Sequence, residues 1–246
     1  MCKAEQPLVA ECEEQSPHVY AQRPLPVRQA EVALVFIGGF GDEVTGIVEY
    51  LARRFPESAL GMQSEAVRAY YHWNGGCVED ATEGFRRIAD DVAAFRRANP
   101  GAAVVLVGHS MGAAAALKVA ELQPLMKDSP GIYLVTLDPA DRVVKPVRPA
   151  GVSWWGNCYV ENSRSQHDFI IALGGRWNHC AAADYNVVFD GRDTDEYGHP
   201  YIHDNAMSLL MSSGGTPAAS LCRKLAAALR AGGYSQRNVA EKPEHP

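Results

Sequence analysis

The chain has 246 residues, of which 47% are hydrophobic and 21% are charged, so it can bury the core of one medium-sized domain. Its formal net charge of −6 at pH 7 argues against a polyanionic partner such as nucleic acid. No apolar run approaches the ~18 residues that a membrane-spanning helix needs, which argues against a transmembrane segment.

The N-terminal segment, residues 1–27, is rich in Glu, Gln and Pro, and predicts a flexible, extended lead-in rather than part of the core. It lacks the basic start and apolar stretch of a secretory signal. We therefore expect a cytoplasmic protein, and export by a machinery that needs no cleaved signal stays open. The cysteines form no C-x-x-C pair, which is typical of reduced, structural thiols.

The first half of the domain predicts strands that alternate with helices. A short apolar run, 31–37, ends at the glycine turn "GGFGD" and is typical of a buried strand. A helical stretch through "EVTGIVEYLARRF" follows, and then "SEAVRAYYHWNGG", which predicts a strand and a turn. "ATEGFRRIADDVAAFRRANPG" has apolar residues at helical spacing and a stop signal at Asn-Pro-Gly.

Two more apolar runs, 102–107 and "GIYLVTLD", predict further buried strands, with the helical "AAAALKVA" between them. Strands and helices that alternate in this way predict a mainly parallel sheet covered on both faces. After residue 150 the pattern is weaker: "VSWWGNCYV" and "YNVVFDG" are strand-like, 161–185 is typical of an insertion, and a helix begins within "YIHDNAMSLLMSS". We predict one domain over 28–232 and a flexible tail over 233–246.

One pentapeptide, Gly-His-Ser-Met-Gly at 108–112, stands between a predicted strand and a predicted helix. It fits the G-x-S-x-G nucleophile elbow, in which a tight turn lifts the Ser110 hydroxyl above the sheet. Glycines two residues before and after the serine let the strand and the helix approach closely. The start of the helix directs unpaired N–H groups at a reacting carbonyl, where negative charge develops.

Through this motif the chain resembles the α/β-hydrolase superfamily of serine hydrolases, in its lipase, esterase and thioesterase-like members. The resemblance covers most of 31–210. It implies an α/β-hydrolase fold, with a small insertion or lid after the strand that carries the acid, within 141–185. It also implies that the catalytic residues follow the order Ser, acid, His along the chain.

The expected acid is Asp138, because it directly follows an apolar strand, one parallel strand after the elbow. "TLDPAD" also resembles the acid motif of the pancreatic-type lipases. A structural Asp before Pro139 is the alternative. Asp193 and Asp195 are weaker candidates, since no strand directs them.

Two histidines in "YGHPYIHDNAM" compete for the role of base. Small relatives with a "DP"-type acid often carry a late His-x-x-Ile-Asp segment, and alignment on Ile202 assigns the base to His199. His203 then occupies the position where the family usually has Asp, and it remains the alternative base. His109, inside the elbow, is expected to position the turn rather than transfer protons.

The oxyanion hole is expected to use two backbone N–H groups. One belongs to Met111, the residue after the nucleophile. The other belongs to Phe40 in "FIGGFGD", where relatives often have His-Gly-x and this chain has Gly38-Gly39-Phe40.

We therefore predict a serine ester hydrolase that acts on a lipid-like acyl ester, as a lipase, phospholipase or esterase, with no metal or organic cofactor. An acyl thioesterase or an acyltransferase is the alternative, because "GHSMG" also resembles the serine site of malonyl-type transacylases. A hydrolase-fold protein that only binds a ligand is the third interpretation. The expected partner is a small-molecule or lipid acyl ester, and the oligomeric state is open.

Overall fold

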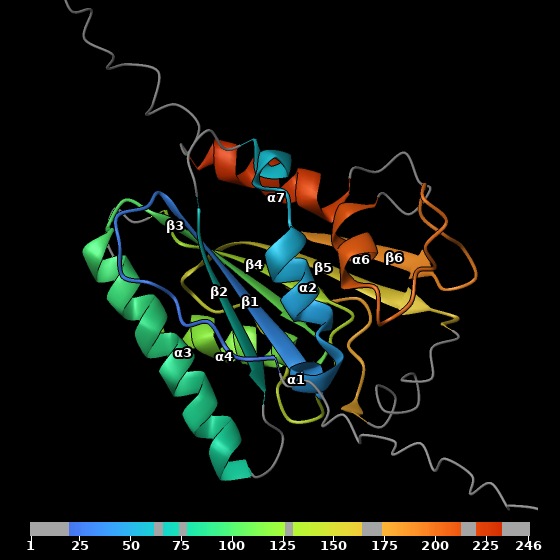
Figure 1. The fold of residues 1–246 in the computed structure, drawn as a ribbon, viewed down its shortest axis with the longest axis horizontal. Helices are drawn as coiled ribbons and strands as arrows, with labels where there is room; N and C mark the ends of the chain where they lie inside the picture. Colours follow the sequence, from blue (N-terminus) through green and yellow to red (C-terminus); the bar gives the residue numbers. More distant parts are fainter. Residues whose placement is uncertain are drawn as a thin grey trace, which may run out of the picture.

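The computed structural model describes residues 20–61, 66–73, 78–125, 130–163, 174–212 and 220–232. Its centre is a six-stranded sheet in the order β2-β1-β3-β4-β5-β6, with every neighbouring pair parallel. The strands are β1 (Val32–Phe40), β2 (Val67–Trp73), β3 (Ala103–His109), β4 (Ile132–Leu137), β5 (Val152–Glu161) and β6 (Tyr185–Asp190). The expected mainly parallel sheet is confirmed (Figure 1).

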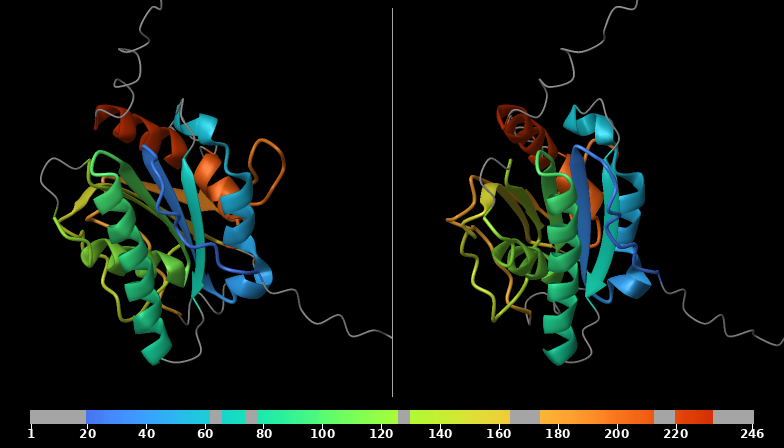
Figure 2. Two further views of the ribbon diagram at one scale, coloured as in Figure 1. Left: turned by 60° about the vertical axis from the view of Figure 1, so that its left-hand side comes forward. Right: turned by 90° about the vertical axis from the view of Figure 1, so that its left-hand side faces the viewer.

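Helices cover both faces of this sheet, as expected (Figure 2). On one face lie α3 (Val78–Ala98) and α4 (Met111–Glu121). On the other lie α2 (Ile47–Arg54), α6 (Ala206–Met211) and α7 (Leu221–Ala231), and the short α1 (Asp42–Thr45) and the 3-10 turn Glu57–Leu60 flank α2.

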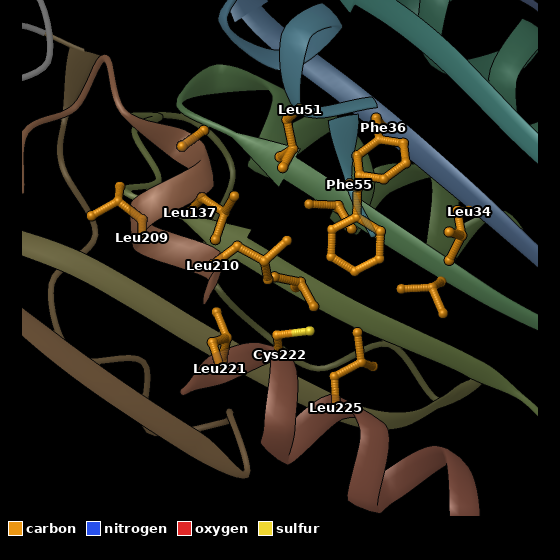
Figure 3. Close-up of a cluster of buried hydrophobic side chains, with 14 of the residues drawn as sticks. Leu34, Phe36, Leu51, Phe55, Leu137, Leu209, Leu210, Leu221, Cys222 and Leu225 are labelled. Atoms are coloured by element: carbon orange, nitrogen blue, oxygen red, sulfur yellow. The ribbon is translucent and has the colours of Figure 1, made fainter. Parts of the chain in front are cut away.

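The buried strands supply both cores because successive side chains point to opposite faces. Along β1, Val32, Leu34 and Phe36 join the core under α2, α6 and α7, whereas Ala33 and Val35 join the core under α3 and α4. Figure 3 shows the first core, in which leucines of α6 and α7 meet Phe36 and Phe55. A strand buried on both faces reads as a continuous apolar run, which is why the sequence revealed it.

The sheet reverses its winding direction between β1 and β3. From β1 the chain passes to β2 on one side, and β3 and the later strands follow on the other side. In open α/β sheets a crevice forms at the carboxyl ends of the strands at such a point, and ligands bind there. The turn after β3 carries Ser110, and β1 ends at the predicted oxyanion donor Phe40.

Two boundaries differ from the sequence prediction. The predicted lead-in, 1–27, is packed on the domain from residue 20 onward: Arg23 pairs with Tyr70 of β2, and Leu25 is only 4% exposed. The predicted insertion, 141–185, contains β5, so it is divided into the connection from β4 to β5 and the connection from β5 to β6, of which 164–173 lies outside the described residues. The predicted tail, 233–246, also lies outside them.

No helix in the described ranges is both long and apolar enough to cross a membrane.

Candidate active site

The Ser110 turn has the strained backbone that the elbow motif predicts. Ser110 has φ 55° and ψ −129°, a conformation that residues with a Cβ rarely adopt. Its N–H donates to the carbonyl of Leu137 at 3.0 Å, and its carbonyl accepts from Ala113 at 3.0 Å and from Ala140 at 3.3 Å. These bonds to the end of β4 and to the loop beyond it hold the strained turn in place.

Asp138 directly follows β4 and is fully buried. It also has a positive φ, 40°. Its Oδ1 accepts from the N–H of Val160 at 3.1 Å, and its Oδ2 lies 2.8 Å from Nδ1 of His203. Burial raises the pKa of this carboxyl, but the hydrogen bond from His203 and the electrostatic attraction of His203 and Arg176 lower it more, so Asp138 is held as a carboxylate.

The alternative base, His203, is therefore the histidine that meets Asp138. It is 5% exposed and lines the same pocket as Ser110. With Nδ1–H donating to Asp138, its Nε2 is left to accept a proton.

His109 holds the segment that carries His203. Its Nε2 lies 2.8 Å from the carbonyl of His203, and the two rings are in contact, tilted by 35° with centroids 4.2 Å apart. A carbonyl can only accept, so Nε2 of His109 must carry its hydrogen. Burial, followed by electrostatic repulsion from His203, lowers the pKa of His109 to about 3, which keeps its ring neutral. His109 therefore links the end of β3 to the segment that carries His203.

His199 lies elsewhere, and the structure does not bring it to Asp138. Its side chain is 62% exposed and pairs with Asp195, with 3.1 Å between Nδ1 and Oδ2. Asp195 accepts the N–H groups of Tyr197 and His199 through Oδ1, and the hydroxyl of Ser208 through Oδ2. His199 and Asp195, both candidates from the sequence, thus form a local pair that closes a surface turn.

The two residues predicted to donate to the oxyanion line the pocket that contains Ser110. Met111 is the first residue of α4, where N–H groups have no acceptor within the helix. Across from it, the pairing of β1 with β2 shifts register between Gly38 and Phe40. Gly39 lies so close to the elbow that a Cβ there would be 2.8 Å from the Cβ of Ser110 and 3.0 Å from the N of Met111. Phe40 is 57% exposed and lines the pocket.

The pocket has a volume of about 130 Å³ and joins these groups. Phe40, Ile47, Met111 and Ala140 give it an apolar wall, and Ser110 and His203 are among its polar residues. A dry cavity of similar size, about 150 Å³, accommodates benzene in another protein. Within the described ranges, no three His, Cys, Asp or Glu side chains are grouped so that they could hold a metal ion.

Arg176 is one residue of the site that sequence reasoning missed. Its Nε and Nη2 lie 3.4 Å from Oδ1 and Oδ2 of Asp138, respectively. The backbone places it there, because Trp177 N–H donates to Pro139 and Asp141 N–H donates to Gly175. Arg176 lies in an insertion without periodicity or motif, so no signal in the sequence pointed to it.

The comparison with family models agrees with the fold. A model of the alpha/beta hydrolase family matches residues 34–241. No curated protein matches the chain significantly. One solved structure that is similar to it is the Vlm2 thioesterase domain with genetically encoded 2,3-diaminopropionic acid, bound with a dodecadepsipeptide; the identity is 14%, the TM-score is 0.41, and the match covers 85% of this chain and 96% of that chain. Since the family model spans most of the sequence, the chain belongs to the alpha/beta hydrolase family.

Proposed function

We propose that this hydrolase is a serine esterase that cleaves lipid-like carboxylic esters through an acyl-enzyme intermediate. The observation that carries the proposal is the buried Asp138–His203 pair at the wall of the pocket that also contains Ser110. A serine hydroxyl becomes a nucleophile when a histidine accepts its proton and a carboxylate orients that histidine. The proposed base is therefore His203, in place of His199.

In the proposed reaction, Oγ of Ser110 attacks the ester carbonyl and its proton passes to Nε2 of His203. Asp138 keeps the imidazole in the correct tautomer and stabilises its protonated form. The N–H groups of Met111 and Phe40 stabilise the oxyanion. As the C–O bond breaks, His203 protonates the leaving alcohol, and then activates a water molecule that releases the acid and regenerates Ser110.

The apolar wall supports an acyl chain as the group bound next to Ser110. Phe40 extends this apolar surface to the exterior, as expected if a longer chain leaves the pocket there. The same proposed residues would also cleave a thioester, so an assay has to distinguish an alcohol from a thiol as the leaving group.

The test is labelling of the folded protein with a fluorophosphonate probe, which phosphonylates an activated serine. We expect labelling of the wild type, none of Ser110→Ala, and strongly reduced labelling of His203→Ala and Asp138→Asn. His199→Ala is the matched control and should label like the wild type, because its side chain is exposed and pairs with Asp195. Loss of labelling in His199→Ala but not in His203→Ala would contradict the assignment of His203 as the base. A wild type that is not labelled, with or without lipid, would contradict the proposal that the protein is a serine hydrolase.

A series of matched esters, thioesters and acceptor alcohols would then identify the reaction. Faster turnover of esters than of thioesters with the same acyl chain would support an esterase. Transfer to an added alcohol that outruns hydrolysis would favour an acyltransferase instead.

A further inference from the structure

A buried carboxylate stands behind the loop that carries the predicted oxyanion donor. The end of β1 and the residue after it, Gly38–Gly41, are hereafter called the oxyanion loop; Asp42 follows directly, begins α1, and is only 2% exposed. It transfers no proton in the proposed reaction. A buried acid without an ion-pair partner costs free energy, so its hydrogen bonds have to compensate for its burial.

The Asp42 carboxylate joins three elements. Its Oδ1 accepts the N–H of Val48 in α2 at 2.9 Å, and its Oδ2 accepts the hydroxyl of Tyr70 in β2 at 2.6 Å. The N-cap residue of α2 is Gly46, which has no side chain, so Asp42 serves as the capping acceptor from four residues earlier. The backbone carbonyl of Asp42 also accepts the N–H of Gly46 at 2.8 Å.

The third contact is with the oxyanion loop itself. A Cβ at Gly38 would lie 2.3 Å from Oδ2 of Asp42 and 2.5 Å from its Cγ, so the carboxylate packs directly against the Cα of Gly38. This contact accounts for glycine at the position where relatives often have histidine: the Asp42 side chain occupies the space. The loop between Gly38 and Asp42 is thus held at both ends, with Phe40 at its centre.

Asp42 lines the pocket that contains Ser110, and the titratable groups that act on it are Tyr70, His72 and Glu43. Tyr70 is completely buried, and Arg23 lies over its ring at 5.8 Å. Glu43 and His72 face each other nearby at 4.0 Å, outside hydrogen-bonding distance. Burial raises the pKa of Asp42, and the hydrogen bonds from Tyr70 and Val48 partly offset the effect.

We propose that Asp42 is a positioning residue, which together with Tyr70 fixes the oxyanion loop so that the Phe40 N–H faces the carbonyl oxygen that develops negative charge. The inference rests on the proposed function, because it concerns the same reaction. Preorganised donors act only if they are held in the geometry of the transition state, so a loosened loop lowers kcat more than it raises KM.

The decisive experiment measures kcat and KM for a short-chain p-nitrophenyl ester, and the rate of fluorophosphonate labelling, in four variants. Active-site titration and thermal unfolding give the folded fraction of each variant. Asp42→Ala should lower kcat by about 100-fold with a much smaller change in KM. Asp42→Asn keeps an acceptor for Val48 and a polar partner for Tyr70, so it should retain most of kcat. Tyr70→Phe removes one of the two supports and should fall between them.

Tyr71→Phe is the matched control. Tyr71 is the next residue of β2, equally buried, and its hydroxyl bonds to Asp91 at 2.7 Å on the opposite face of the sheet. It should lose stability as Tyr70→Phe does, but keep kcat. Equal kcat in the wild type and Asp42→Ala, or equal losses of kcat in Tyr70→Phe and Tyr71→Phe, would overturn the role of Asp42. A wild type that neither labels nor turns over would instead refute the proposed function.

Discussion

Gly112→Ala is the perturbation that tests most directly how the elbow is built. Gly112 is the second residue of α4, and a Cβ there would lie 2.2 Å from the carbonyl oxygen of Ile37 and 2.8 Å from the carbonyl of Gly38. Ordinary contact begins at 3.4 Å, so the start of α4 has to move away from β1 by about 1 Å. Both obstructing groups are backbone, which cannot rotate away.

This displacement should separate Met111 from Phe40, the two proposed oxyanion donors. A misplacement of about 1 Å at a reacting centre costs about 100-fold in rate, and overpacking costs about 1–3 kcal/mol of unfolding free energy. The assays are kcat/KM on a p-nitrophenyl ester and urea unfolding. Gly84→Ala in α3 is the control: no atom lies within 4 Å of its new Cβ, so stability should rise by about 0.5–1 kcal/mol. A folded Gly112→Ala protein with unchanged kcat/KM would refute the reasoning.

Three further predictions concern titration and burial. Burial lowers the pKa of His109 from 6.5 to about 3, so below pH 6.5 the unfolded chain binds a proton that the folded protein excludes. The free energy of unfolding should therefore fall as the pH drops below about 6.5, and it should fall less steeply in His109→Gln. Urea unfolding across pH 4–7 measures both. The pH dependence expected from Asp42 is the reverse, because the pKa of Asp42 is raised in the folded protein. The free energy of unfolding should fall as the pH rises from about 4 through the pKa of the folded state, and Asp42→Asn should remove that loss in the same unfolding series. Burial raises the pKa of the Cys158, Cys180 and Cys222 thiols, so they should not react with iodoacetamide at pH 8 until the protein unfolds. Mass spectrometry detects the modification, and rapid labelling of these thiols in the folded protein would contradict their burial.

The local pattern of the sequence determined the parallel sheet, the elbow and the position of Asp138. Strands buried on both faces read as apolar runs, and the G-x-S-x-G motif describes a turn whose geometry depends on five consecutive residues. Asp138 follows because residues at the carboxyl ends of adjacent parallel strands meet at one edge of a sheet. These features need no knowledge of distant contacts.

Only the tertiary structure decided which histidine meets that acid. His199 and His203 stand four residues apart in a segment with little regular structure, and the family pattern favoured His199, because His203 occupies a position where the family usually has Asp. The contact between His203 and Asp138 spans 65 residues, whereas His199 is held by its neighbour Asp195.

The contacts of Arg176 and Asp42 could not be predicted from the sequence either. Arg176 reaches Asp138 from an aperiodic insertion, and Asp42 meets Tyr70 and Gly38 only after β1 and β2 pair. A periodic pattern in the sequence indicates which face of a strand or helix a side chain lies on. A contact made by a single side chain between two loops produces no such pattern, so only the packing of the folded chain determines it.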